Sequence, residues 1–241
     1  MGRAHEVRAA SMAKTAAAKS KLNNKWSRII YMAAKSGLPD PDLNQNLKKE
    51  IEKAKKEQVT ADVIKRAIEK AKGANMESYS ELLLEGFGPG NSMVVVECLS
   101  DNSNRTQTAV KIALPKCGGK IAGSGSVTYM FDHISIFSME NINDEELLEV
   151  LLMADCEVND IEVDENLVTV FAPNTEYSKI RTAIREAYPD IDFLEDSIAW
   201  VGKTEVELTE EKQIEQFKRL LDMLEEEDDV QEVFHNVVGL N

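Results

Sequence analysis

The residues with the clearest chemical potential in this chain are cations near its N-terminus. Residues 1–28 contain seven lysines and arginines against the single carboxylate of Glu6. Cations at this density neutralise phosphates and release counterions, so the pattern predicts nucleic-acid binding. The alternative is a solvated, disordered tail, which terminal charge runs usually form. The candidate phosphate-binding residues are Arg3, Arg8, Lys14, Lys19, Lys21, Lys25 and Arg28.

The charge is divided along the chain. Residues 1–73 carry 17 Lys and Arg against 8 Asp and Glu, a net charge of +9. Residues 74–241 carry 11 against 35, a net charge of −24, so the overall −15 conceals a basic module. A polyanion would be attracted to the first segment and repelled by the second.

Few aromatic residues accompany these cations. Trp26 alone lies among them, and its spacing with Ile30 and Ala33 is that of a buried helix stripe. Base stacking is therefore not indicated, and recognition of the backbone or shape of structured RNA is favoured. If five to seven single-stranded phosphates are met, the logarithm of affinity should fall with the logarithm of salt with a slope of roughly −4 to −5.

Arg105 is a further candidate for phosphate binding. Residues 101–106 (DNSNRT) lie at a predicted junction between a strand and a helix, where helix capping explains Asp101 to Asn104 without a ligand. Arg105 falls in the first helical turn, where the helix dipole disfavours a cation. It could pair with Asp101, or it could reach a phosphate.

Other chemistry is weakly supported. Three widely spaced cysteines and three isolated histidines predict neither a disulfide framework nor a metal site, so the thiols are expected to be buried and reduced. GFGPG at residues 86–90 lacks the Lys-Ser/Thr of a phosphate-binding loop and reads as a tight hairpin turn. The acidic run 225–229 reads as a solvated helix end. We therefore expect no enzyme activity, no cofactor and no bound metal.

The elements that position these residues follow from periodicity. Apolar spacing predicts helices over residues 21–35, from an N-cap at Asp42 through Ala54, and from Thr60 to Gly73, while residues 1–20 are expected to form a mobile arm or a helix that orders on binding. Strands are predicted at 80–87, 93–99, 126–131, 134–138, 157–163, 167–172, 193–201, 204–208 and 230–238. Further helices are predicted at 102–114, ended by Pro115 and Gly118-Gly119, and at 143–154, 175–187 and 210–226.

The order of these elements predicts an α+β fold with three domains. Residues 1–75 form the basic helical domain with its arm. Residues 76–132 and 205–241 form a discontinuous α/β domain, because neither segment alone has enough packing partners. Residues 133–204 follow the βαββαβ order of a ferredoxin-like domain, carry a net charge of −13, and are inserted between its halves.

Three motifs carry a family resemblance that spans essentially the whole chain: GFGPG at 86–90, ECLSDNSNRT at 97–106 and GSVTYMFD at 125–132. They resemble the YebC/PmpR family, whose members are named probable transcriptional regulatory proteins and include a mitochondrial translational activator. The resemblance implies the same three-domain fold. The N-terminus, GRAHEVR at 2–8, departs from the GHSKW-type arm of most members and is closer to the YeeN-like branch.

The combined reading is a cytoplasmic, monomeric, nucleic-acid-binding regulator of gene expression. The resemblance implies a translation factor that binds the ribosome through ribosomal RNA or tRNA and eases synthesis of proline-rich stretches. The alternative is a transcriptional regulator that binds promoter DNA, although no helix presents the compact polar face of a major-groove reader. A third possibility is a protein–protein adaptor that works through the acidic ferredoxin-like domain. No apolar run approaches the ~20 residues needed to span a bilayer, and no signal peptide is evident.

Overall fold

The computed structural model describes residues 3–73 and 79–240, with side chains described from residue 19 onward. The chain divides into two compact units. The first comprises the chain up to Leu84 together with Val96–Ala113 and Leu221–Val233, and the second comprises Glu85–Val95, Leu114–Leu220 and the chain from Phe234. Within the described ranges, no helix is both long and apolar enough to cross a membrane.

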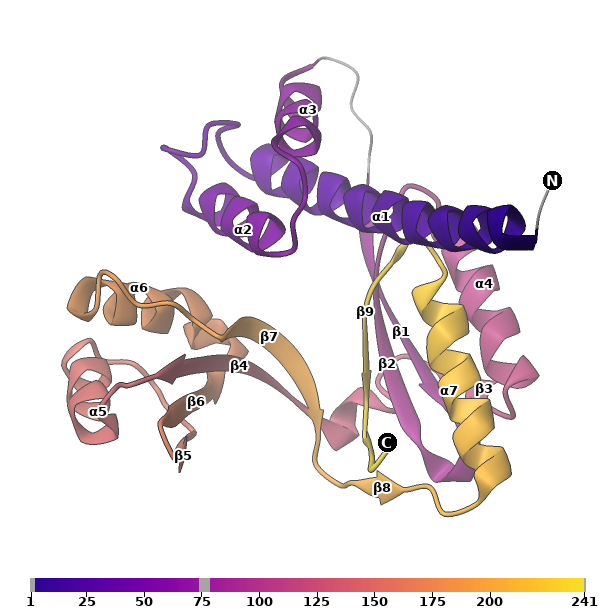
Figure 1. Cartoon of the computed structure of the whole chain (residues 1–241). Coiled ribbons are helices and arrows are strands. Elements are labelled where there is room, and N and C mark those ends of the chain that lie inside the picture. The colour runs from indigo at the N-terminus through magenta and orange to yellow at the C-terminus, as the bar shows by residue number, and fades with distance from the viewer. Residues whose placement is uncertain (1–2, 74–78, 241) are drawn as a thin grey trace. The chain divides into compact units, whose positions relative to one another are not determined.

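The N-terminal part is a three-helix module (Figure 1). Its helices are α1 (Arg3–Lys35), α2 (Gln45–Lys56) and α3 (Ala61–Lys72). The helix predicted from residue 21 begins at Arg3, so the backbone of the N-terminal segment from Arg3 is helical. The three helices bury one shared core, as their apolar periodicity predicts. That core contains Trp26, Ile30, Tyr31, Leu47, Ile51, Ala54, Ile64, Ala67 and Ala71.

The cap of α2 is Asn44, and the expectation that Asp42 would cap it was wrong. The Asn44 Oδ1 accepts a hydrogen bond from the Leu47 backbone N–H at 3.0 Å. Its Nδ2 donates to the carbonyls of Ala33 and Leu38, both at 2.9 Å. Asp42 instead donates its backbone N–H to the side chain of Asp40 in the preceding turn. Asn44 therefore begins α2 and joins it to the end of α1.

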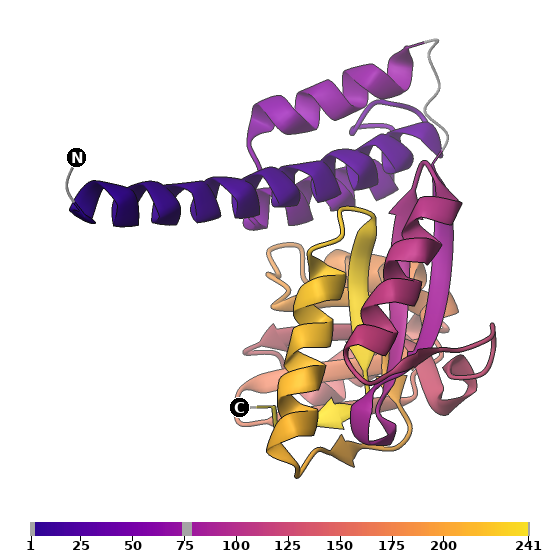
Figure 2. The ribbon, with the colours of Figure 1, turned by 90° about the vertical axis from the view of Figure 1, so that its right-hand side faces the viewer.

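A four-stranded sheet follows the helical module along the chain, in the order β3-β1-β2-β9. Its strands are β1 (Ser80–Phe87), β2 (Met93–Ser100), β3 (Lys120–Ile121) and β9 (Val230–His235). Helices α4 (Ser103–Lys116) and α7 (Glu211–Glu225) lie side by side on one side of this sheet (Figures 1 and 2). A short parallel pair, β8 (Val206–Glu207) and β10 (Val237–Val238), lies apart from it.

The glycine-rich segment between β1 and β2 is a tight turn, as predicted. A short 3-10 turn, Pro89–Asn91, places Gly90 at φ 65° and Asn91 at φ 63°. This left-handed backbone suits glycine, since other residues meet a Cβ penalty there. A Cβ on Gly90 would also come within 2.5 Å of Leu208.

Residues 126–131 do not form the predicted strand, because a buried carboxylate binds their backbone. Glu85, which is 3 % exposed, accepts backbone hydrogen bonds from Gly125, Val127 and Thr128 at 2.6, 2.6 and 2.9 Å. These N–H groups therefore need no neighbouring strand. A 3-10 turn, Thr128–Met130, leads instead into β4 (Phe131–Glu140). Burial opposes ionisation of Glu85, but the hydrogen bonds outweigh it and lower its pKa.

Two other predicted boundaries also shift. Pro115 lies inside α4, which continues to Lys116, so it does not end the helix. The strand predicted over residues 230–238 is interrupted at Asn236. The Asn236 Oδ1 accepts from the Met93 backbone N–H at 2.8 Å, and its Nδ2 donates to the Thr204 carbonyl at 3.1 Å. A side chain that bonds backbone on both sides divides the strand into β9 and β10.

The inserted segment has the βαββαβ topology that the sequence predicts. Its elements are β4 (Phe131–Glu140), α5 (Asp144–Met153), β5 (Asp160–Asp164), β6 (Leu167–Pro173), α6 (Tyr177–Ala187, after the 3-10 turn Asn174–Glu176) and β7 (Glu195–Gly202). The sheet order is β5-β6-β4-β7 with every pair antiparallel. In the register, Phe137 pairs with Val170 and Asp196. The chain is therefore α+β with a ferredoxin-like insertion, which confirms the predicted fold class.

Replacing Asn44 by alanine should destabilise the helical module. The change removes the cap and leaves the carbonyls of Ala33 and Leu38 without this donor, so we expect the free energy of unfolding to fall by about 2 kcal/mol. Chemical denaturation followed by circular dichroism would measure this. Asn46→Ala, on the exposed side of α2, is the control and should change stability by less than about 0.5 kcal/mol. Equal effects of the two variants would contradict the assigned role.

Candidate nucleic-acid interface

The structure places the N-terminal candidate cations on one helix, α1. Lys19 is exposed and Lys21 is half-buried. Arg3, Arg8 and Lys14 also belong to α1, but their side chains lie outside the described residues. On a helix of 3.6 residues per turn, these positions do not share a single face.

Lys25 has a carboxylate partner within the chain. Its Nζ lies 2.7 Å from Glu232 Oε1. The two side chains are 25 % and 58 % exposed, so water and salt screen this pair and it contributes little to stability. A phosphate could therefore displace Glu232 from Lys25 at modest cost.

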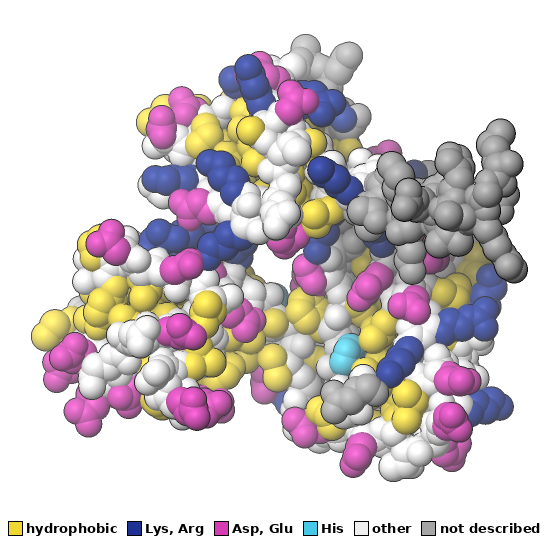
Figure 3. Space-filling view, in the orientation of Figure 1, with side chains coloured by type: hydrophobic (Ala, Val, Ile, Leu, Met, Phe, Trp, Pro, Cys, Tyr) yellow, Lys and Arg dark blue, Asp and Glu magenta, His cyan; other side chains and the backbone are white. Residues whose placement is uncertain are grey.

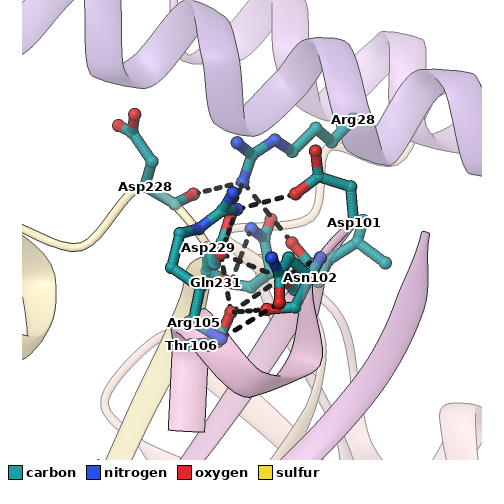
Figure 4. Close-up of polar contacts among 10 residues, drawn as sticks. Arg28, Asp101, Asn102, Arg105, Thr106, Asp228, Asp229 and Gln231 are labelled. Carbon is teal, nitrogen blue, oxygen red and sulfur yellow. Dashed lines mark hydrogen bonds and ion pairs between the residues drawn. The ribbon is translucent and has the colours of Figure 1, made fainter. Parts of the chain in front are cut away.

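Arg28 and Arg105 converge on one buried carboxylate, Asp229, which is 5 % exposed (Figure 4). Arg28 Nη1 donates to Asp229 Oδ1 at 2.7 Å. Arg105 Nη2 lies 2.6 Å from Asp229 Oδ2. The hydroxyls of Ser100 and Thr106 approach the same oxygen at 2.9 and 2.6 Å. We call these five residues the Asp229 cluster. It joins α1 to the start of α4 and to the turn before β9.

The pKa of Asp229 follows from these contacts. Burial alone would raise it, but hydrogen bonds from Thr106, Arg105 and Ser100, with the charge of Arg28, outweigh burial and hold the pKa below its ordinary value. Asp229 is thus an ionised, fully engaged carboxylate. The expectation that the whole acidic run is solvated was wrong for this last residue.

Of the two roles that the sequence left open for Arg105, the structure shows the pairing with Asp101, and it adds a second carboxylate partner. Arg105 pairs with Asp101 at 2.7 Å as well as with Asp229, and these bonds raise its pKa. Its backbone N–H donates to Asn102 Oδ1 at 3.1 Å, which confirms the capping role of that asparagine. The unfavourable position of Arg105 in the helix was the sequence signal for a strong local partner. Asp229, more than a hundred residues away, could not be identified from that signal.

A second group of cations lies along a groove between α2 and α3, which the sequence analysis did not single out. The groove has a volume of about 400 Å³ and is lined by Lys55, Lys65 and Lys72 beside Ile64 and Ile68. Lys55 and Lys65 are exposed, and Lys72 pairs with Glu69 at 2.9 Å. Figure 3 shows dark-blue side chains recurring over α2 and α3 among yellow apolar ones. In the sequence, composition was the signal for this second group of cations, because ten of the 17 cations of residues 1–73 follow residue 28.

Cys98, Cys117 and Cys156 are buried free thiols, as predicted. Burial, with the nearby charges of Asp229 and Glu97, raises the pKa of Cys98 to about 12, so this thiol is unreactive at neutral pH. Within the part of the chain that the structure describes, no cluster of His, Cys, Asp and Glu could hold a metal ion.

Asp229→Asn should destabilise the protein at neutral pH. Hydrogen bonds to charged groups contribute about 1.5–3 kcal/mol, so removing the charge should lower the free energy of unfolding by about 2 kcal/mol. Because the folded-state pKa lies below the unfolded value of about 3.9, this contribution is present above roughly pH 4 and is lost as pH falls through the folded pKa. Denaturation at several pH values would show the difference from wild type shrinking in acid.

Asp228→Asn is the matched control for this change. Asp228 has an exposed side chain, and it meets Arg28 only through its backbone carbonyl at 2.8 Å. The control should stay within about 0.5 kcal/mol of wild type. A pH-independent difference between wild type and Asp229→Asn would exclude an ionised Asp229 as its cause.

Comparison with known proteins covers almost the whole chain. The model of the TACO1/YebC protein N-terminal domain matches residues 3–74, and that of the TACO1/YebC second and third domain matches residues 79–237. A probable transcriptional regulatory protein of Alteromonas mediterranea is 50 % identical over 238 residues, 99 % of either chain. One of Pseudoalteromonas translucida is 51 % identical over 241 residues, the full length of both.

A solved structure agrees with the sequence comparison. The crystal structure of a conserved hypothetical protein from Aquifex aeolicus matches with a TM-score of 0.73 at 30 % identity, covering 90 % of this chain and 89 % of the other. Both helical and mixed domains therefore have counterparts in that protein. The chain belongs to the TACO1/YebC family.

Proposed function

We propose that this protein is a nucleic-acid-binding regulator of gene expression and, more specifically, a translation factor that binds the ribosome through ribosomal RNA or tRNA. The observation that carries the proposal is the concentration of cations on α1, α2 and α3, with a net charge of +9 in residues 1–73 against −24 in the rest. Such a module attracts polyanions and the remainder repels them, which favours binding in one orientation. Relatives named probable transcriptional regulatory proteins support the regulatory role.

The interface we propose has two parts. The first is the basic stretch of α1, where Lys19 and Lys21 would meet phosphates together with Arg3, Arg8 and Lys14. The second is the α2–α3 groove with Lys55 and Lys65. Lys25, Arg28 and Arg105, which have carboxylate partners, would join only if a phosphate replaced Glu232 or Asp229.

The described helices of the module expose no aromatic side chain as a stacking platform, which favours recognition of backbone and shape. Of the aromatic residues in the described helices of the module, Trp26 and Tyr31 are buried at 4 % and 2 % exposure. The Trp26 indole N–H donates to Glu57 Oε2 at 2.8 Å, so its polar edge is also engaged. Structured RNA, read through its phosphates and sugars, suits such a surface. Residues 1–75 would then be the binding domain. The other two domains, one formed by residues 76–132 with 205–241 and the other by residues 133–204, would project from the RNA.

The alternative function is a DNA-binding transcriptional regulator, which the names of the relatives favour. Two measurements separate it from the first. Co-sedimentation with ribosomes, and relief of pausing on a run of prolines in a purified translation system, would support the translation factor. Tight binding to one promoter duplex that survives excess non-specific DNA, with no ribosome binding at low salt, would support the transcriptional regulator.

Neutralising four cations of the interface should weaken ribosome binding and its salt dependence. For Lys19, Lys21, Lys55 and Lys65 changed together to Gln, we expect the slope of log affinity against log salt to become less negative by roughly 3, at roughly 0.7 per phosphate contact. Co-sedimentation over a series of salt concentrations would measure it. The control changes Lys111, Lys116, Lys212 and Lys218 of α4 and α7 to Gln, with the same loss of charge. If both variants behave alike, binding follows net charge and the proposed interface is wrong.

A further inference from the structure

Helix α5 of the ferredoxin-like insertion has an outer face that the fold does not use. Its inner face contributes Leu147 and Leu151, both fully buried, to the core that includes Val170 of β6 and Ile180 of α6. Outside this inner face, Leu148, Leu152 and Met153 are exposed by 40 %, 63 % and 86 %. Single exposed apolar residues are ordinary. Leu148 and Leu152 lie one turn apart on the same side of α5, and Met153 adds a third exposed apolar side chain at its C-terminal end.

Carboxylates share this outer face. Glu145, Leu148, Glu149 and Leu152 follow the i, i+3, i+4, i+7 spacing of one helix side, and Glu145 and Glu149 are both exposed. Figure 3 shows yellow and magenta side chains intermixed in the region of α5. Exposed apolar side chains beside charged ones are the usual composition of a binding surface.

Local helix stability accounts for only part of this pattern. Asn143 caps α5 through the Glu146 backbone N–H at 2.9 Å, and the acidic residues of the first turn suit the helix dipole. Glu149, in the middle of the helix, gains little from the dipole. The last turn contains no basic residue, although cations are favoured there, and instead exposes Leu152 and Met153. The stability of the fold therefore does not explain the exposed apolar residues in the last turn of α5.

We propose that the outer face of α5 binds a basic amphipathic helix of a partner protein. Apolar residues of that helix would cover Leu148, Leu152 and Met153, and its Lys and Arg would meet Glu145 and Glu149. The charge of residues 133–204 argues against nucleic acid, an anionic membrane or a second copy of the same acidic face, since each would be repelled. A single helix face buries little area, so the association is weak and transient.

A direct test uses the full-length protein with 13C-labelled methionine methyl groups. The probe is a synthetic peptide of about 18 Lys and Leu residues, arranged so that its helix has one apolar face; this length supports helicity. We expect the Met153 resonance to shift on titration more than the other eight methionines. A peptide of the same composition, reordered so that no apolar face forms, should bind at least about tenfold more weakly, which corresponds to 1.4 kcal/mol.

Matched variants locate the interaction. Leu152→Gln with Met153→Gln keeps the charge and should weaken peptide binding about tenfold, as loss of a central contact does. Leu43→Gln with Ile112→Gln removes comparably exposed residues elsewhere, at 69 % and 48 % exposure, and should leave binding unchanged. Glu145→Gln with Glu149→Gln should weaken binding and reduce its dependence on salt.

Several results would overturn the proposal. These are equal binding of the two peptides, an unshifted Met153, or equal effects of the two apolar variants. Self-association lost in Leu152→Gln with Met153→Gln would identify a second copy as the occupant, and binding of anionic vesicles through Met153 would identify a membrane. None of these outcomes bears on nucleic-acid binding, which the lysine variants of α1, α2 and α3 test separately.

Discussion

The first compact unit depends on how one buried carboxylate is compensated. A carboxylate removed from water without partners is strongly destabilising, so Asp229 can stay ionised only because two guanidinium groups and two hydroxyls surround it. Those donors come from α1, from the end of β2 and from the first turn of α4. A single ionised group therefore sets the mutual positions of segments that are far apart in the chain.

This arrangement changes how the basic charge should be understood. Lys25, Arg28 and Arg105 were candidates for phosphate binding, and each has a carboxylate within 2.7 Å. The free-energy cost of freeing each cation for a phosphate depends on how deeply its carboxylate partner is buried. The side chain of Glu232 is 58 % exposed, whereas that of Asp229 is 6 % exposed. Net charge describes the long-range attraction of a polyanion, but the local partners decide which cations can make contact.

Local pattern predicted most of the fold. β1 was placed residue for residue, and the Gly90 turn and the ferredoxin-like order followed from periodicity and turn residues. Three of the failures share a physical cause, since each involves a polar side chain that bonds groups distant in sequence. Glu85 binds backbone about forty residues later, Asn236 binds Met93, and Asp229 gathers the two arginines. Hydrophobic periodicity carries no information on such contacts.

The same distinction separates structural from binding residues among the charged groups. Glu85 and Asp229 are buried, and the hydrogen bonds they accept stabilise the native state. Glu149 of α5 and Lys65 of α3 are exposed on faces that do not contribute to either core. A charged residue whose partner is internal adds stability, and one that the fold leaves in water can exchange that water for a ligand. By this criterion the exposed charges of the helical module and of the ferredoxin-like insertion, which are opposite in sign, are the ones that remain available to ligands of opposite charge.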